Sequence, residues 1–314
     1  MASFKKSALI ASMALMSFTQ QASANATLTF GDVRIGVQSL GALGGNGVGI
    51  SFAGVGDAIM PGCLCEGWGA SYDSVFGYSG NSNGGDINVS ALSFSSTAST
   101  AVSSVLVGSS LSVTQAYAPS ASAGLFKNTV TLTNTGVSTV SDVRYSRSMD
   151  WDIPPTTFSE YVTINRGTSS NLIFSNDNGF GTPNPLENPS DIASGTRNVS
   201  FVDSGPNDHG AFFTFGFGAL AAGESKTFNI FYGATASEAS ALSALGTVGA
   251  EVFSLGQSSS GGEITGSPAT YIFGFSGVGG APVIPAVPEP ETYAMLLAGL
   301  GLLGAAARRK KTQA

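Results

Sequence analysis

Short runs of β-forming residues, separated by turn residues, fill most of the middle of this chain and limit the folds open to it. The clearest run is Leu125–Asn134, where Val130 and Leu132 share one face because side chains alternate along a strand. Turn residues at 134–136 end this run, and residues 140–150 follow as its partner. Runs joined by short turns predict antiparallel strands.

Further strands are expected along the same stretch, again from β-forming composition between turn residues. They are predicted at residues 27–37, 87–94, 101–107, 110–117, 158–164, 196–202, 211–217 and 225–232. Residues 40–86 are rich in glycine and lack a period, so we expect long loops with short strands there. The stretch 176–195 is rich in Pro, Gly and Asx residues and is expected to be a long loop.

One segment has a helix pattern instead. Thr235 and Glu238 have the spacing of a capping box, Leu242 and Leu245 are apolar, and a glycine follows. Many strands, short turns and one short helix predict an all-β fold, an antiparallel β-sandwich body. We place this body at residues 25–275.

The first residues have the layout of a secretory signal peptide. Two lysines precede an apolar stretch at 8–18, and Ala22 and Ala24 form a small-x-small cleavage site. We predict a signal helix over residues 1–24, cleaved after Ala24, with cleavage after Ala26 as the alternative. The predicted partners are signal peptidase and the general secretion machinery, which place the body outside the cytoplasm.

An uncharged apolar run at residues 293–307 is predicted to be a transmembrane helix. A helix of this length spans roughly 22 Å, less than the hydrocarbon core of about 30 Å. The cations after it form a membrane-stop cluster of Arg308, Arg309, Lys310 and Lys311. Because such residues resist translocation, they favour a cytoplasmic C-terminus. The alternative is a buried C-terminal core helix.

Pro288, Glu289 and Pro290 stand before this helix and follow a linker at residues 276–287. Proline favours extended backbone in the residue before it, so the tripeptide is expected to be stiff and accessible. The motif, the short helix and the basic cluster together resemble the PEP-CTERM sorting signal of Gram-negative bacteria. We assign this sorting signal to residues 288–311.

The resemblance implies a partner and a location. Members of this family are recognised by exosortase, an integral-membrane protease-transpeptidase that processes them at or near the Pro-Glu-Pro motif. The chain would be anchored transiently in the inner membrane with its C-terminus in the cytoplasm. Processing would then release it to the cell surface or the extracellular space. The family also implies a link to exopolysaccharide or biofilm production.

The body is more acidic than the whole chain. Residues 25–287 hold 7 basic and 18 acidic side chains, a net charge of −11, whereas the whole chain carries −7. This charge disfavours nucleic acid and anionic lipid as partners. Sparse charge with abundant Ser, Thr, Gly and Asn resembles extracellular surface proteins. We therefore expect a surface or matrix protein with a structural or adhesive role, and no cofactor, with Ca²⁺ as the one candidate.

Asp150 and Asp152 flank Trp151, and in a strand both carboxylates point to one face. Paired carboxylates beside an aromatic ring suit glycoside hydrolysis or sugar binding, and they also suit Ca²⁺. The interpretation we prefer is a strand end whose carboxylates cap a turn or pair with Arg144 or Arg147. The alternative function is a secreted glycan-active hydrolase or a Ca²⁺-dependent carbohydrate-binding protein. Because no catalytic constellation is complete, we do not predict an enzyme.

Cys63 and Cys65 are the two cysteines, and we expect a local disulfide in a surface loop. A crosslink between chains is the alternative. His209, the one histidine, is expected to be a solvated loop residue. The Asx-rich loops at 176–179 and 203–210 lack the spacing of a calcium-binding loop, so we interpret both as turns.

Overall fold

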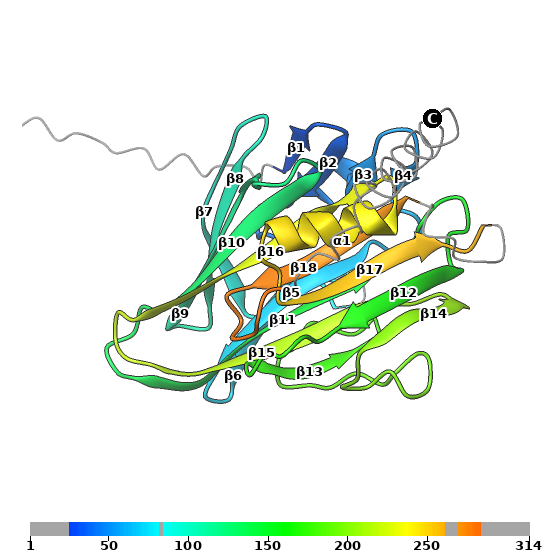
Figure 1. Cartoon of the computed structure of the whole chain (residues 1–314). Coiled ribbons are helices and arrows are strands. Elements are labelled where there is room, and N and C mark those ends of the chain that lie inside the picture. The colour runs from blue at the N-terminus through cyan, green and yellow to red at the C-terminus, as the bar shows by residue number, and fades with distance from the viewer. Residues whose placement is uncertain (1–24, 82–83, 261–268, 284–314) are drawn as a thin grey trace, which may run out of the picture.

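The computed structural model of the chain describes residues 25–81, 84–260 and 269–283. Within these residues the strands form three sheets, in which all paired strands are antiparallel (Figure 1). The largest, called the long sheet, has the order β14-β12-β17-β18-β16-β10-β9-β8-β7. Its strands are β14 (Phe201–Asn207), β12 (Glu160–Asn165), β17 (Val252–Ser258), β18 (Thr270–Ser276), β16 (Ser225–Thr235), β10 (Leu125–Asn134), β9 (Leu111–Pro119), β8 (Ala101–Val107) and β7 (Val89–Ser96).

A second sheet of order β13-β15-β11-β5-β6 packs against the long sheet. Its strands are β13 (Leu172–Asn176), β15 (Gly210–Leu220), β11 (Val140–Asp150), β5 (Cys65–Tyr72) and β6 (Val75–Asn81). Aromatic rings meet between the two layers. The ring centroids of Phe213 and Phe273 lie 5.6 Å apart, and those of Phe215 and Phe275 lie 4.8 Å apart. The predicted antiparallel β-sandwich is confirmed.

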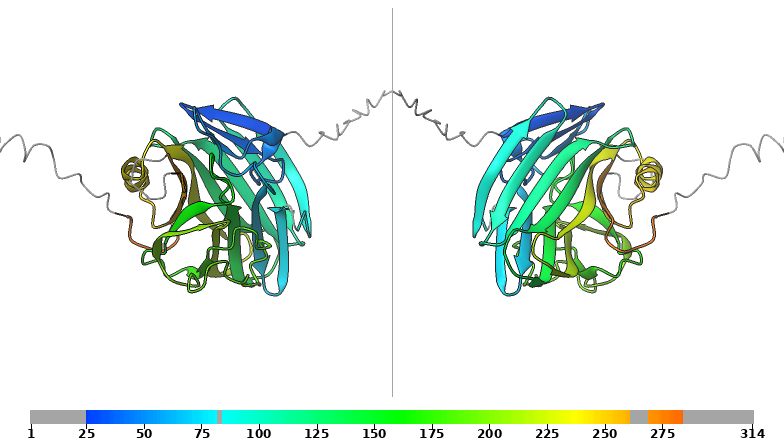
Figure 2. Two further views of the ribbon diagram at one scale, coloured as in Figure 1. Left: turned by 90° about the vertical axis from the view of Figure 1, so that its right-hand side faces the viewer. Right: turned by 90° about the vertical axis from the view of Figure 1, so that its left-hand side faces the viewer.

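A small N-terminal sheet of order β1-β2-β3-β4 lies at one end of the sandwich, where β2 and β3 contact β16 (Figure 2). It consists of β1 (Ala26–Phe30), β2 (Val33–Val37), β3 (Ile50–Phe52) and β4 (Gly56–Asp57), with a 3-10 turn, η1, at Gly45–Gly47. The strand predicted at 27–37 is therefore two strands. They turn at Gly31, whose φ of +58° favours glycine.

The segment 38–44 after β2 covers a buried ion pair between Arg147 and Glu66. Leu43 N donates a hydrogen bond to Glu66 Oε2 over 2.7 Å, and Arg147 Nη2 donates to Gly41 O over 3.4 Å. Both charged side chains have no exposed surface. We call this segment the sealing loop, because its backbone satisfies polar groups that the sandwich core leaves open.

The α-helix of the described residues, α1 (Glu238–Thr247), covers the outer face of the long sheet (Figures 1 and 2). Leu245 is fully buried in this contact. The helix was predicted, but the sequence pattern placed its N-cap at Thr235. Ser237 is the N-cap and accepts a hydrogen bond from Ser240 N over 3.3 Å, while Thr235 ends β16.

Predicted and observed strands agree best where apolar residues alternate. The predictions at 101–107, 125–134 and 140–150 match β8, β10 and β11. The strand predicted at 196–202 lies instead at 201–207, as β14. Strands β13, β17 and β18 were not predicted, and β5 and β6 occupy part of the stretch expected to be mostly loops.

The C-terminal end of the body is fastened by Glu251. Its carboxylate accepts hydrogen bonds from the backbone N–H groups of residues 277, 278 and 280, over 2.6, 3.0 and 2.7 Å. Farther on, Val283 N donates to Ala250 O over 2.6 Å. The fold therefore extends past Ser276, the predicted start of the linker, and we call this fastening the Glu251 clasp.

The helices in the described part of the chain are all too short or too polar to cross a bilayer. The predicted signal helix at 1–24 and the predicted transmembrane helix at 293–307 lie outside the described residues.

Candidate functional site

Asp150 and Asp152 lie where β11 leaves the second sheet. Side chains keep alternating past the strand end, so Trp151 and Ile153 enter the core between the sheets while the two carboxylates point away from it. The indole Nε1 of Trp151 donates to Ser254 Oγ over 3.1 Å. The buried indole therefore holds the backbone that presents both carboxylates.

The turn between β14 and β15 brings a third carboxylate, Asp208, to the same place. Asp150 pairs with Gly210 in the ladder between β11 and β15, which sets the turn beside the end of β11. Carboxylate oxygens of Asp150, Asp152 and Asp208 all lie within 4.8 Å of one another. We call these three residues the carboxylate triad.

Glu160, the first residue of β12, adds a further buried carboxylate near the triad. It pairs with Asn207, the residue before Asp208, in the ladder between β12 and β14. Its Oε1 accepts a hydrogen bond from Ile153 N over 3.2 Å, directly after Asp152 in the chain. Three separate segments thus bring acidic groups to one point.

These carboxylates are buried and short of partners. Asp150 is 1% exposed, and Asp152 and Glu160 are 0% exposed, whereas Asp208 is less buried. Among the described residues, no hydrogen-bond partner exists for Asp150 Oδ1, Glu160 Oε2 or either carboxylate oxygen of Asp152. A buried carboxylate is stabilised by a cation, by hydrogen-bond donors or by a bound proton, and donors from the described residues do not fill this role for these atoms.

The predicted pairing of Asp150 and Asp152 with Arg144 or Arg147 is wrong. Arg144 Nη2 lies 2.8 Å from Asp142 Oδ2, and Arg147 pairs with Glu66 in the core. Arg147 shares the inward face of β11 with Trp151, and Arg144 lies about 20 Å along the strand from Asp150. No lysine or arginine within residues 25–81, 84–260 and 269–283 forms an ion pair with the triad.

Burial shifts the titration of the whole cluster. Burial, together with the negative charges of the neighbouring carboxylates, raises the pKa of Asp150 to about 9. Burial also raises the pKa of Asp152 to about 7 and that of Glu160 to about 8. The pKa of Asp208 is raised by burial as well. Without a cation, the cluster therefore retains protons at pH values where exposed carboxylates are ionised.

Gly62 packs directly against the triad. Gly62 has a φ of +78°, and a Cβ there would lie 3.1 Å from Asp152 Oδ2 and 2.6 Å from Phe158 Cε1. The side chain of Phe158 remains half-exposed to solvent. A larger residue at position 62 would strain the backbone and displace Phe158 or Asp152.

Cys63 and Cys65 form a disulfide next to the triad, with their Cα atoms 5.1 Å apart. Cys63 is half-buried, and Cys65 begins β5 with no exposed surface. Cys63 Sγ lies 3.8 Å from Asp150 Oδ2. Because a disulfide sulfur carries no proton, this contact does not satisfy the carboxylate.

His209 is buried, so its predicted role as a solvated loop residue is wrong. Its Nδ1 lies 3.1 Å from Asp177 Oδ2, and its Nε2 lies 3.3 Å from Glu160 O. Asp177 also accepts hydrogen bonds from the N–H groups of residues 192 and 193 and from the hydroxyl of Thr196. Burial raises the pKa of Asp177, but these hydrogen bonds outweigh it and lower that pKa overall.

Both Asx-rich loops reach the end of β11. The loop 203–210 contributes Asp208, and the loop 176–179 packs against Asp150, where a Cβ on Gly179 would lie 2.4 Å from Asp150 Cα. The loop 176–179 is a turn, as predicted, because Asn178 N donates to Asn176 Oδ1 over 3.2 Å. The turn predicted at 203–210 is wrong for most of its length, because residues 203–207 belong to β14 and Gly210 begins β15, which leaves Asp208 and His209 between the strands.

The triad geometry suits a cation better than a sugar. The two carboxyl groups of glycosidases lie about 5–5.5 Å apart in retaining enzymes and about 6.5–9.5 Å apart in inverting ones, around a substrate. The triad oxygens are closer, and Asp150 and Asp152 are buried. The sequence pattern pointed to Asp150 and Asp152, but it placed Asp208 in a turn and Glu160 in a strand. Only the pairing of strands far apart in the chain brings these four residues together.

A second surface is a row of cross-strand polar pairs on the long sheet, which we call the hydroxyl ladder. It consists of the pairs Thr129–Asn229, Thr131–Thr227, Thr133–Ser225 and Ser104–Thr114, each 2.7–3.0 Å apart. Such pairs stabilise neighbouring strands. They also place a row of uncharged hydrogen-bonding groups on the outer face of the sheet, next to Lys127.

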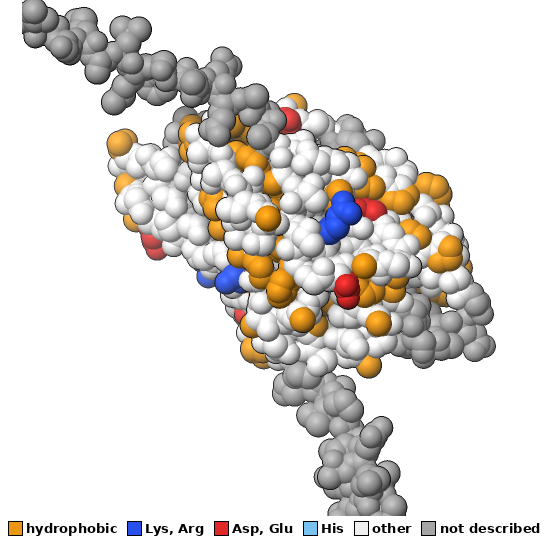
Figure 3. Space-filling view, turned by 90° about the horizontal axis from the view of Figure 1, so that it is seen from above, with side chains coloured by type: hydrophobic (Ala, Val, Ile, Leu, Met, Phe, Trp, Pro, Cys, Tyr) orange, Lys and Arg blue, Asp and Glu red, His pale blue; other side chains and the backbone are white. Residues whose placement is uncertain are grey.

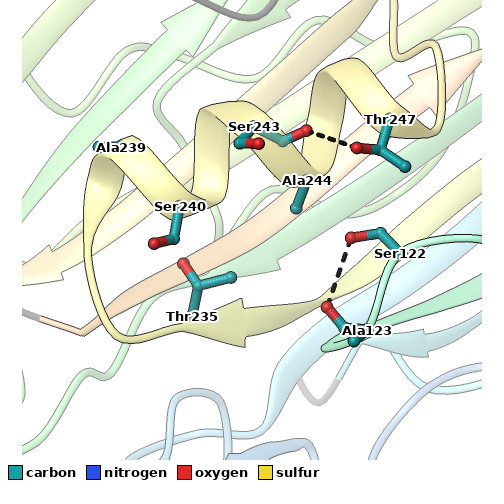
Figure 4. A pocket seen from close by; sticks show the side chains of 8 residues that line it. All are labelled: Ser122, Ala123, Thr235, Ala239, Ser240, Ser243, Ala244 and Thr247. Carbon is teal, nitrogen blue, oxygen red and sulfur yellow. Dashed lines mark hydrogen bonds between the residues drawn. The ribbon is translucent and has the colours of Figure 1, made fainter. Parts of the chain in front are cut away.

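A hollow beside α1 is lined by small and hydroxyl side chains (Figure 4). Its lining residues are Ser122, Ala123, Thr235, Ala239, Ser240, Ser243, Ala244 and Thr247. The Ser122 hydroxyl donates to Ala123 O over 3.3 Å and the Thr247 hydroxyl donates to Ser243 O over 2.9 Å. With no charged group in its lining, the hollow offers no acid, base or metal ligand.

The other predicted site residues lie outside the described part of the chain. They are Ala22 and Ala24 at the predicted signal cleavage site, Pro288, Glu289 and Pro290 in the sorting motif, and Arg308, Arg309, Lys310 and Lys311 in the membrane-stop cluster.

The model of the PEP-CTERM protein-sorting motif matches residues 286–310, which include the Pro-Glu-Pro tripeptide and all but the last of the four cations. No curated protein sequence matches the chain. The solved structure of a galactose mutarotase related enzyme from Lactobacillus acidophilus is similar over 81% of this chain and 86% of that chain. The sequence identity is 8% and the TM-score 0.30. A TM-score this low assigns neither fold nor function.

The motif implies export, transient anchoring in a membrane at the C-terminal end, and processing by exosortase. It begins three residues after the last described residue of the sandwich, Val283. The chain is a PEP-CTERM domain-containing protein, and its described residues form the β-sandwich body that precedes the sorting motif.

Proposed function

We propose that this chain is a surface or extracellular-matrix protein with a structural or adhesive role in an exopolysaccharide or biofilm setting. The observation that carries the proposal is the sorting motif at residues 286–310, joined to a β-sandwich that the Glu251 clasp closes just before it. Once exported, a folded body of this kind would contact matrix polymers.

The surface of the body supports an adhesive role. On the face seen in Figure 3, charged side chains are few and separated by uncharged polar and hydrophobic groups. The hydroxyl ladder presents hydrogen-bonding groups without charge. Uncharged polysaccharides are recognised by such groups, and the acidic net charge of the body disfavours nucleic acid as a partner.

The direction of insertion completes the proposal. The basic cluster after the apolar run favours a cytoplasmic C-terminus in the inner membrane, with the sandwich outside. The N-terminal segment at residues 1–24 acts as the signal peptide, removed by signal peptidase after passage through the general secretion machinery.

Mass spectrometry of the surface fraction tests the processing step. We expect mature chains that lack the basic tail, and we expect Glu289→Ala to leave the tail attached. Glu291→Ala is the matched control, since it removes a neighbouring carboxylate outside the tripeptide and should leave processing intact. Full-length C-termini alone in the surface fraction would refute the proposal.

A binding assay with the host's exopolysaccharide tests the adhesive role. Replacing Thr131 and Thr227 together by valine keeps their shape and removes two hydroxyl groups of the ladder, so we expect weaker retention on the polymer. Thr97→Val, in a hydroxyl pair at a loop, is the control. Equal retention of all three chains would contradict a role for the ladder.

A screen for polysaccharide hydrolysis separates this proposal from the enzyme alternative. A binding or structural body gives no turnover above background in either the wild type or Asp152→Asn. Strong turnover that is lost in Asp152→Asn would replace the structural role by a hydrolase.

A further inference from the structure

The carboxylate triad holds more negative groups than its surroundings neutralise. Asp150 and Asp152 are buried with three oxygens that find no partner among the described residues, and Asp208 completes the group at a more exposed position. We propose that Asp150, Asp152 and Asp208 bind a calcium ion, with the buried Glu160 nearby, where its Oε1 accepts from Ile153 N. This inference goes beyond the proposed surface role and does not depend on it.

The spacing of the oxygens fits a single ion. Calcium binds oxygen at about 2.3–2.6 Å, so two of its ligands can lie at most about 5.2 Å apart. The triad oxygens lie within 4.8 Å of one another, which is inside that limit. Calcium takes six to eight oxygen ligands, and the three carboxylates of the triad together with water can supply that number.

The chemistry of the donors selects a hard cation. All three side chains of the triad offer carboxylate oxygens, which suit calcium or magnesium more than softer metals. The nearby sulfurs of Cys63 and Cys65 are bonded to each other and therefore cannot bind a metal as thiolates. His209 is engaged by Asp177 at one ring nitrogen and lies near Glu160 O at the other. The site is thus one of oxygen ligands.

Two states can relieve the repulsion among these buried groups. Either the carboxylates retain protons, as their raised pKa values favour, or a cation binds and replaces the protons. A bound cation would also give the Asp152 carboxylate a partner, since neither of its oxygens has one among the described residues. Calcium binding would release protons from the cluster.

Calcium at this point would join two parts of the fold. It would tie the end of β11 to the turn between β14 and β15, next to the start of β12. Extracellular modules bind calcium with dissociation constants of about 10⁻⁴–10⁻³ M. A site in that range fills where calcium is millimolar, as outside the cell, and it would stiffen the body after export.

Titration calorimetry and thermal unfolding of the purified full chain test the site. We expect one Ca²⁺ per chain, and a rise in Tm of about 5 °C or more at a Ca²⁺ concentration about 100-fold above Kd. Terbium offers a second probe, because Trp151 lies between two of the ligands and should sensitise its luminescence. Added Ca²⁺ should then quench that luminescence by displacement.

Matched variants locate the ion. Asp152→Asn should weaken Ca²⁺ binding on the order of 10-fold to 100-fold and raise the Tm measured without Ca²⁺, because it removes a buried repelling charge. Asp208→Asn, at a less buried position, gives the same test if Asp152→Asn fails to fold. Asp142→Asn removes an exposed carboxylate paired with Arg144 and should leave Ca²⁺ binding unchanged.

Two results would overturn the proposal. One is a wild-type chain that gives no Ca²⁺ heat, no Tm shift and no terbium luminescence, which would leave a protonated carboxyl cluster. The other is a Tm shift that Asp152→Asn and Asp208→Asn both retain, which would place the ion elsewhere on the chain.

Discussion

Replacing Glu66 by glutamine is expected to lower the free energy of unfolding by about 4 kcal/mol or more. Glu66 neutralises Arg147 inside the core, and both side chains are fully buried. Removing one partner of a buried ion pair costs about 3–5 kcal/mol, because it leaves an uncompensated charge. The new amide would also place a donor or a weaker acceptor against Leu43 N, 2.7 Å from Glu66 Oε2, at a cost of about 1–3 kcal/mol.

The other contacts of Arg147 do not replace the lost charge. Its Nη1 donates to Gln115 Oε1 over 2.7 Å and to the Tyr145 hydroxyl over 3.1 Å, and both partners are neutral. In a body of this size, a loss of about 4 kcal/mol lowers Tm by about 8–16 °C. The sealing loop should open first, since it bonds directly to Glu66 through Leu43.

Tryptophan fluorescence during urea unfolding gives the measurement. Trp68 and Trp151 are both buried and are the only two tryptophans in the chain. Asp142→Asn is the matched control on an exposed ion pair, where the expected loss is about 0–1 kcal/mol. If Glu66→Gln costs no more than this control, the buried charge is not what holds the sealing loop, and the reasoning fails.

Three further changes test other parts of the fold by unfolding measurements. Ser237→Ala removes the cap of α1 and should cost about 1 kcal/mol of stability in urea unfolding. Glu251→Ala removes the acceptor of three backbone N–H groups and should cost on the order of 3 kcal/mol, with protease cleavage at residues 277–283 appearing before global unfolding. Asp177→Asn should be less stable than wild type at neutral pH. Because the folded-state pKa of Asp177 is lowered, that stabilisation is present above its unfolded pKa of about 3.9 and fades as the pH falls below it, so urea midpoints of the two chains should converge there.

How well a strand could be predicted depended on whether one of its faces meets solvent. β10 has one buried face and one wetter face, so its apolar residues alternate and the pattern reveals it. Every residue of β5, β17 and β18 is buried, and such strands carry no alternation to recognise. The backbone at Pro183 also packs closely against β5, since a Cβ on Gly69 would lie 1.8 Å from Pro183 O.

The candidate site divides in the same way between local and long-range information. Asp150 and Asp152 could be paired from their spacing, since two residues in a strand share a face. Asp208 joins them only because β14 and β15 pair with strands far away in the chain, and His209 is buried for the same reason. A lone histidine in an Asx-rich segment carries no local sign that Asp177 will bind it.

The Glu251 clasp also limits how far the body can stand from its sorting motif. The backbone is held to the fold at Val283, and Pro288 follows five residues later. Even a fully extended chain covers only about 18 Å over that distance, close to the radius of gyration of a domain of this size, about 18 Å. Exosortase would therefore meet the motif beside the folded body, on the side where α1 and Val283 pack together. The length of this tether, rather than the motif alone, would decide how closely a membrane enzyme and a folded substrate must fit.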